Sequence, residues 1–313
     1  MKFSFTLALA LFPLVWGAAV EKRASTSDVA TTGYASTGSG TTGGKGGATT
    51  TVTSLAALTS AAAGDTPGIV LISGTITGNT VVKVGSNKSI LGKYGAALVG
   101  VGLRVNRVKN VIIRNLKISK VLADAGDAIG IQEASQVWVD HVELSSDRDH
   151  DKDYYDGLLD ITHGCTGVTV SYSILRDHWK GSLVGHSDSN ASEDVSIRVT
   201  YHHNYWYNLN SRLPSFRFGQ GHIYANVFEN SNDGINTRKG AQLLVQNNVF
   251  SGVSKPLYET DGGFAVAQGN DFGGKTNTAP AGTLTTVPYS YSLESVGSVR
   301  ANVVGVAGAN LGF

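Results

Sequence analysis

Five charged side chains in the middle of the sequence are spaced so that a coiled, repeating fold would bring them together. They are Asp127, Asp156, Asp160, Lys180 and Arg212. The intervals are 29 residues from Asp127 to Asp156, 24 from Asp156 to Lys180 and 32 from Lys180 to Arg212, with Asp160 four positions after Asp156. If each interval is one turn of a coil, neighbours would lie roughly 4.8 Å apart along its axis. One side of the molecule would then be acidic at the earlier turns and basic at the later ones. This pattern suits an acidic substrate that a hard cation bridges to protein carboxylates.

Calcium is the cation that such a carboxylate set favours, because Ca²⁺ takes about six to eight oxygen ligands at about 2.3 to 2.6 Å. Asp127, Asp156 and Asp160, supplemented by water and substrate oxygens, would supply them. A straight strand would hold Asp156 and Asp160 about 13 Å apart, so the chain has to bend near Gly157 for both to reach one ion. Either aspartate alone is more simply a solvated turn residue, and only the set predicts a metal site.

A basic segment follows, NSRLPSFRFG at residues 210–219, in a chain that is otherwise nearly neutral. It places Arg212 and Arg217 five positions apart around Pro214. From residue types alone, both arginines are expected to bind an anionic ligand, since a guanidinium with a pKa above about 12 is normally locked as a cation.

The elements that would hold these residues form a repeat of short β-branched segments. Six segments align on one position: NVIIRNLKI, QVWVDHVEL, GVTVSYSIL, VTYHHNYW, HIYANVFEN and LLVQNNVF. The residues at that position follow one another in steps of 26, 32, 31, 22 and 22: Asn115, His141, Ser173, Asn204, Asn226 and Asn248. Such steps, with no helix between the strands, predict an all-β fold, a parallel β-helix. Asparagines stacked at one bend would have a structural role, because they can hydrogen-bond along the axis.

Residues 53–63, TSLAALTSAAA, are the one good helix candidate and are expected to form an N-terminal capping helix over the open end of the stack. The repeat fades over residues 251–313, which are expected to pack along the side of the coils. No second domain is evident, so residues 24–313 are predicted to form a single β-helix catalytic domain. The single cysteine, Cys165, excludes an internal disulfide.

The N-terminus has the pattern of a targeting segment. Residues 1–19 are typical of a signal peptide, and residues 20–23 of a short propeptide that ends in Lys22-Arg23. We therefore expect a secreted, extracellular monomer with no membrane association. Removal of residues 1–23 would take away three basic residues and one acidic residue and change the formal net charge from +1 to −1. That charge argues against binding to nucleic acid.

Together with DYYDGLLDI, DHWKGSLVGHSDSN and SRLPSFRFG, the repeat segments resemble the pectate lyase family of right-handed parallel β-helices, polysaccharide lyase family 1. The resemblance runs in order from about Gly40 through Phe250. It implies a right-handed single-stranded parallel β-helix. It also implies cleavage of polygalacturonate, also called pectate, by Ca²⁺-dependent β-elimination, which gives 4,5-unsaturated oligogalacturonates.

The resemblance also implies a role for each charged residue. Three match the family's calcium ligands: Asp127, Asp156 and Asp160. Two match its binders of substrate carboxylates, Lys180 and Arg217, and one matches its catalytic base, Arg212. Some members carry a further Asp two residues before the one that Asp127 matches, and here that position is Ala125. The ion is therefore expected to bind more weakly before substrate arrives.

The implied reaction removes the C5 proton of a uronate, which is acidic only because a carboxylate lies next to it. Neutralising that carboxylate with Ca²⁺, Lys180 and Arg217 would stabilise the enolate-like charge that develops. Cationic neighbours disfavour the charged form of an arginine. The neutral form is a strong base, which suits the removal of so weakly acidic a proton. The VWVDH segment around Asp140 and His141 is shared with the family too, and we interpret it as a buried structural network.

Three alternatives stay open from the sequence. A pectin lyase would act on methyl-esterified polymer without calcium, and the three aspartates at the calcium positions argue against it. A β-helix glycoside hydrolase would need two carboxyl groups roughly 5 to 9.5 Å apart, which Asp156 and Asp160 could imitate. In a carbohydrate-binding or adhesive β-helix, Arg212 would be replaceable by Lys.

Overall fold

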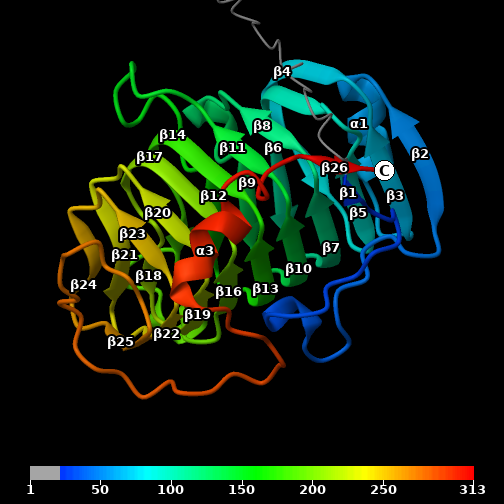
Figure 1. The fold of residues 1–313 in the computed structure, drawn as a ribbon. Helices are drawn as coiled ribbons and strands as arrows, with labels where there is room; N and C mark the ends of the chain where they lie inside the picture. Colours follow the sequence, from blue (N-terminus) through cyan, green and yellow to red (C-terminus); the bar gives the residue numbers. More distant parts are fainter. Residues whose placement is uncertain (1–21) are drawn as a thin grey trace, which may run out of the picture.

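The protein is a parallel β-solenoid whose coils carry three strands each, in a computed structural model that describes residues 22–313. Figure 1 shows the coils stacked along one axis in chain order. One strand of each coil belongs to a 10-stranded sheet, called the first sheet here: β2 (Ala48–Val52), β3 (Gly68–Ile72), β5 (Lys88–Gly92), β7 (Lys109–Arg114), β10 (Ser135–Asp140), β13 (Thr166–Ser171), β16 (Arg198–His202), β19 (Gln220–Tyr224), β22 (Gln242–Gln246) and β25 (Phe264–Gln268). The predicted all-β parallel β-helix is confirmed.

The other strands form two rows, which the long strand β6 (Ala97–Asn106) joins into one 14-stranded sheet. The second row is β8 (Lys117–Ser119), β11 (Glu143–Ser145), β14 (Ile174–Lys180), β17 (Tyr205–Ser211), β20 (Val227–Glu229) and β23 (Val249–Ser251). The third row is β9 (Ile129–Gln132), β12 (Leu159–Thr162), β15 (Leu183–Val184), β18 (Ser215–Arg217), β21 (Asp233–Arg238) and β24 (Lys255–Thr260). On the N-terminal side, β4 (Thr75–Val84) pairs with β6.

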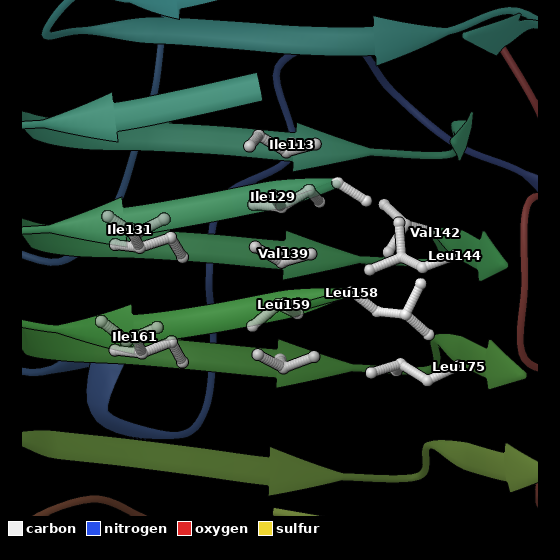
Figure 2. Close-up of a cluster of buried hydrophobic side chains, with 14 of the residues drawn as sticks. Ile113, Ile129, Ile131, Val139, Val142, Leu144, Leu158, Leu159, Ile161 and Leu175 are labelled. Carbon is white, nitrogen blue, oxygen red and sulfur yellow. The ribbon is translucent and has the colours of Figure 1, made fainter. Parts of the chain in front are cut away.

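Apolar side chains that point into the coils form the core, and they stack on their equivalents in the next coil (Figure 2). Ile113, Val139 and Val170 are register partners on three successive strands of the first sheet, and all three are fully buried. Ile131 and Ile161 repeat the arrangement in the third row. Burying such a side chain contributes roughly 1.5 to 3 kcal/mol, and the stacking holds the coils in a fixed register.

Side chains at the bend after the first sheet form the predicted ladder. The backbone N–H of Asn204 donates to Asn226 Oδ1 at 2.9 Å, and that of Asn226 donates to Asn248 Oδ1 at 3.0 Å. Ser173 N–H likewise donates to Asn204 Oδ1 at 2.9 Å. These side chains are fully buried, so they satisfy backbone donors that water cannot reach. Their structural role is confirmed.

The predicted alignment assigned His141 and Asn115 to the ladder, but in each case the ladder position belongs to the following residue. Asp140 pairs with Arg114 and Ser171, so His141 and Asn115 come one residue before the ladder, at positions with φ of 50° and 56°. The ladder position itself is taken by the apolar residues Leu116 and Val142 in these two coils, so the polar residue next to it was aligned instead. Asn115 has a different partner: its amide exchanges two hydrogen bonds of 2.8 Å with the backbone of Leu311 near the C-terminus.

The predicted helix is present as α1 (Leu55–Ala62), which packs on β2, β3 and β4 at the N-terminal end of the coils. Its role as an end cap stays a prediction. The structure adds α2 (Ala191–Asp194), α3 (Val296–Val303), and the short 3₁₀ turns η1 (Tyr34–Ser36) and η2 (Ala123–Ala125).

The repeat extends past residue 251, since β24 and β25 continue the coils, so the boundary predicted there was too early. The segment beyond it lies along the side, as expected, with Val299 and Val303 of α3 packed on Tyr224 and Val227. The last strand, β26 (Leu311–Gly312), pairs with β1 (Lys22–Arg23) beside the first coils.

The predicted signal peptide over residues 1–19, and the first half of the predicted propeptide, lie outside the described residues. Within residues 22–313, none of the helices has the length and apolar character needed to cross a membrane.

Candidate active site

Five of the six predicted site residues lie at one corner of the coils, where the second row ends and the third row begins, and Arg217 lies at the other end of the third row. Asp127 precedes β9, and Asp156 and Asp160 precede and enter β12. The basic residues come from later coils: Lys180 ends β14, Arg212 follows β17, and Arg217 ends β18. The parallel register therefore places the acidic coils before the basic ones along the axis, as the spacing predicted.

Asp127 and Asp160 converge on Gly157. A side chain at Gly157 would begin 2.6 Å from Asp160 Oδ1 and 2.8 Å from Asp127 Oδ1, so a larger residue would push the two carboxylates out of their present positions. The backbone N–H of Gly157 donates to Asp127 Oδ1 at 3.1 Å, and that of Leu183 donates to Asp160 Oδ1 at 2.8 Å. The connection before β12 bends at Leu158, next to the position where the sequence required a bend.

Both carboxyl groups are held in an environment that disfavours their charge. Burial raises the pKa of Asp127 well above its ordinary value, and the charges of Asp160 and Asp156 raise it further. Burial also raises the pKa of Asp160 to about 6, although Arg212 opposes the shift. Two buried carboxylates that lack a sufficient positive partner are a favourable place for a cation.

Asp156, unlike Asp127 and Asp160, pairs with a lysine. Its Oδ1 accepts from Lys180 Nζ at 3.3 Å, and the same ammonium donates to Asp153 Oδ1 at 3.3 Å. Among residues 22–313, no three His, Cys, Asp or Glu side chains are gathered into a ready-made metal centre. The structure thus brings two of the three predicted ligands into one cluster and leaves the third within electrostatic reach, paired to a lysine.

This donor set fits calcium. It consists of carboxylate oxygens, which hard cations prefer, and burial, followed by the charges of Asp160 and Asp156, raises the pKa of Asp127. Asp127 and Asp160 would hold the ion, with Asp156 released from Lys180 to join them.

Arg212 reaches this cluster from two coils further along the axis. Its Nη1 lies 3.8 Å from Asp160 Oδ2, and its backbone carbonyl accepts from Ser182 N–H at 2.7 Å. The side chain is only part-buried, so one side of the guanidinium is open to a bound ligand.

Arg217 lies further along the axis and contacts neither aspartate of the pair. Its Nε donates to Asp188 Oδ1 at 2.5 Å, and Arg238 Nη2 reaches the same carboxylate oxygen at 3.3 Å. Arg217 and Arg238 are register partners on β18 and β21, which extends the basic row by one coil.

The sequence reasoning missed Arg238, Asp188 and His178. Arg238 had a usable signal, since it follows Arg217 by 21 residues, close to one coil. His178 is two positions before Lys180 on the same strand and accepts the Lys180 backbone N–H at 2.8 Å through Nδ1. Burial and the charge of Lys180 lower the pKa of His178 to about 4, so this imidazole is neutral near neutral pH.

The VWVDH segment lies on the first sheet, away from this corner. The Asp140 carboxylate, 2% exposed, accepts from Arg114 Nε at 2.6 Å, from His141 Nδ1 at 2.7 Å and from Ser171 Oγ at 2.6 Å. Arg114 also binds Asp28 at 2.7 Å. The buried network predicted for Asp140 and His141 is confirmed.

A parallel β-helix with a buried carboxylate pair and a basic row at one corner defines a class of protein suited to an acidic polymer. Comparison with known proteins makes the class specific. The pectate lyase family profile matches residues 8–310, and the chain belongs to this family.

Fungal relatives cover almost the whole chain. Pectate lyase A of Aspergillus niger is 59% identical over 295 residues, which span 93% of this chain and 91% of the relative. Pectate lyase A of Emericella nidulans is 59% identical over 295 residues, with 93% and 90% covered.

Solved structures agree in fold. A pectate lyase from Bacillus sp. N165, crystallised with trigalacturonate, is 31% identical with a TM-score of 0.81, over 90% of this chain and 99% of that chain. Pectate lyase II from Xanthomonas campestris is 28% identical with a TM-score of 0.76, over 90% and 98%. The chain is therefore a polysaccharide lyase of the pectate lyase family.

Proposed function

We propose that the protein is a secreted pectate lyase that cleaves polygalacturonate by Ca²⁺-dependent β-elimination and releases 4,5-unsaturated oligogalacturonates. The observation that carries the proposal is the buried Asp127–Asp160 pair, short of positive charge and facing a basic row. Membership of the pectate lyase family supports it, as does the relative from Bacillus sp. N165, which was crystallised with trigalacturonate.

Each residue has a separate task in this proposal. Asp127, Asp156 and Asp160 bind calcium, which when bound would neutralise the uronate carboxylate beside the C5 proton. Lys180 and Arg217 bind substrate carboxylates. To do so, Lys180 gives up contacts with Asp153 and Asp156, and Arg217 gives up contacts with Asp188. Arg212, part-exposed beside the pair, takes the C5 proton in its neutral form, while the C4–O bond breaks and the leaving oxygen takes a proton from water.

Lys180 and Arg217 also determine which polymer is accepted. A methyl ester has no charge to offer either cation, so a demethylated chain should bind better than an esterified one. The same two residues are neutralised by aspartates in the free protein, which leaves little net positive charge to attract nucleic acid. We propose that the partner is pectate, with no nucleic acid or membrane involved, and that the protein acts as an extracellular monomer.

Ultraviolet detection of the 4,5-unsaturated product from polygalacturonate tests the proposal, with added Ca²⁺ in one arm and excess EGTA in the other. We expect product only with calcium. Saturated ends would indicate a glycoside hydrolase, and activity restricted to methyl-esterified pectin in EGTA would indicate a pectin lyase. Binding without any product would indicate a carbohydrate-binding protein.

A further inference from the structure

Arg104 lies beside the carboxylate pair although it belongs to an earlier coil. It is a residue of β6, and its register partner on β9 is Gly130, whose own partner on β12 is Asp160. Arg104, Gly130 and Asp160 therefore form one row across three neighbouring strands. With no side chain in the middle position, the long arginine side chain can extend along the row toward the acidic site.

Two glycines shape the space that the guanidinium occupies. A side chain at Gly130 would begin 2.8 Å from Arg104 Nε and 3.1 Å from Asp127 Oδ2. A side chain at Gly126 would begin 2.7 Å from Arg104 Nη2. The two glycines therefore leave room for the guanidinium of Arg104 on the Asp127 side of the pair.

Arg104 differs from Arg217 and Arg114 in its pairing, whereas Arg212 likewise comes no closer than 3.8 Å to a carboxylate. Arg217 and Arg114 each bind a carboxylate within 3 Å, at 2.5 and 2.6 Å. Arg104 Nε is buried without a hydrogen-bond partner among residues 22–313, and its Nη1 makes one long contact of 3.4 Å with Gln132 Oε1. Its positive charge nevertheless lowers the pKa of Asp127 against the effect of burial.

We propose that Arg104 is the built-in countercharge of the Asp127–Asp160 pair before metal binds, and that its charge limits the calcium affinity of the site. The inference rests on the proposed function in so far as the metal is calcium. Arg212 flanks the pair on the Asp160 side and Arg104 on the Asp127 side. Ala125, which is buried two residues before Asp127, adds no further negative charge.

The two effects have opposite signs. Without metal, Arg104 offsets the repulsion between buried carboxylates, so removing its charge should destabilise the metal-free protein. With metal, the guanidinium repels the incoming cation, so removing its charge should tighten binding. At the effective dielectric constant of about 20 that applies near protein surfaces, one unit charge a few ångströms away is enough to change the dissociation constant by about tenfold.

The test compares three variants of the full mature protein with the wild type. Arg104→Gln removes the charge, and Arg104→Lys keeps it. Arg107→Gln is the matched control, because Arg107 is an exposed arginine just beyond β6 that pairs with Glu133 at 2.9 Å, outside the site. Calcium binding is measured by calorimetric titration with CaCl₂ without substrate, and the melting temperature is measured in EGTA and in excess Ca²⁺.

We expect Arg104→Gln to bind Ca²⁺ about tenfold more tightly and to melt about 2 °C or more below the wild type in EGTA, with the difference removed by Ca²⁺. Arg104→Lys and Arg107→Gln should match the wild type within about twofold in affinity. An unchanged or weaker affinity in Arg104→Gln, or a melting loss that Ca²⁺ does not restore, overturns the inference. If Arg104→Gln does not fold, a wild-type affinity in Arg104→Lys supports it and a changed affinity overturns it.

Failure of the proposed function gives a different result. A wild type that binds no Ca²⁺ and is fully active in EGTA removes calcium from the proposal whatever the variants do. The melting temperatures in EGTA then test only whether Arg104 is a countercharge. A larger fall in melting temperature in Arg104→Gln than in Arg107→Gln supports this role, and equal falls overturn it.

Discussion

Two buried aspartates on different faces of the coil, Asp140 and Asp160, show opposite behaviour. Asp140 receives three side-chain donors within 2.7 Å, and although burial acts against its charge, the hydrogen bond from His141 and the charges of His141 and Arg114 hold its pKa below the ordinary value. Asp160 receives one backbone donor at 2.8 Å and has Arg212 only at 3.8 Å, and burial raises its pKa to about 6.

The difference lies in the number and charge of the donors, since both side chains are buried. A carboxylate whose acceptor sites are filled by the protein has a structural role, because it has nothing left to offer a ligand. A carboxylate that is buried with too few donors retains an unmet demand for positive charge. We call the first arrangement, around Asp140, the closed cluster, and the second, around Asp127 and Asp160, the open cluster.

The largest expected effect belongs to the open cluster. Arg212→Lys keeps a positive charge but loses the planar guanidinium, and a flexible ammonium cannot reproduce its position beside substrate. If Arg212 is the base, kcat should fall by about 10² to 10⁴, with little change in oligogalacturonate binding. The measurement is kcat together with calorimetric binding of a short oligogalacturonate.

Arg114→Lys, the same change in the closed cluster, is the control and should leave kcat unchanged. An Arg212→Lys variant that retains more than about a tenth of wild-type kcat would make Arg212 an electrostatic clamp worth about 1 kcal/mol or less.

The next largest effect should be on stability, in the closed cluster. Asp140→Asn removes the charge that Arg114 and His141 bind, and leaves the largely buried guanidinium with Asp28 as its remaining carboxylate partner. Breaking a buried pair from one side costs about 3 to 5 kcal/mol. Chemical denaturation should show a loss of this order in the free energy of unfolding, while kcat of the folded fraction stays at the wild-type value. A fall in kcat at unchanged stability would mean that the closed cluster is not purely structural.

The sequence predicted the fold well because the coil repeat leaves a mark at every turn. Ser173, Asn204, Asn226 and Asn248 recur with the β-branched segments, and each makes the contact that its position implies. The missed last turn carries the same mark, since Asn248 N–H donates to Asn270 Oδ1 at 2.9 Å, another 22 residues on.

The sequence also predicted that acidic and basic residues share one corner, because coil spacing alone decides that. It did not predict their pairings. Whether Asp156 turns to a metal or to Lys180, and whether Arg104 reaches Asp127 over Gly130, depends on side-chain lengths and on which positions are glycine in neighbouring coils. Spacing along the chain carries no information about either.

A smaller effect should appear in the pH dependence of stability. The folded pKa of Asp160, about 6, exceeds an unfolded value near 3.9, so the folded protein holds a proton that the unfolded chain releases. In EGTA this contribution should lower stability as pH rises from about 4 to 6, by about 2 kcal/mol. Asp140 has the opposite sign: its stabilisation is complete above about pH 4 and is lost as pH falls through its lowered folded pKa.

Melting temperatures from pH 3 to 7 separate the two clusters. Asp160→Asn should weaken the dependence between pH 4 and 6 and leave the part that the raised pKa of Asp127 contributes, and Asp140→Asn should flatten the profile below pH 4. Excess Ca²⁺ should abolish only the first dependence. A wild-type profile that Ca²⁺ leaves unchanged between pH 4 and 6 would contradict a metal site at the open cluster.

The smallest expected effect is also the most specific to the open cluster. Asp160→Asn keeps the size of the side chain and an oxygen that can accept the Leu183 N–H, so folding should be preserved. It removes one of the negative charges that would attract the metal, and we expect the calcium concentration for half-maximal rate to rise about tenfold, the effect of about 1.4 kcal/mol. Asp140→Asn removes the same charge from the closed cluster and should leave that concentration unchanged. Equal calcium dependence in the wild type and both variants would make Asp160 a turn residue with no part in metal binding, and burial with too few donors would then not be enough to identify a cation site in this fold.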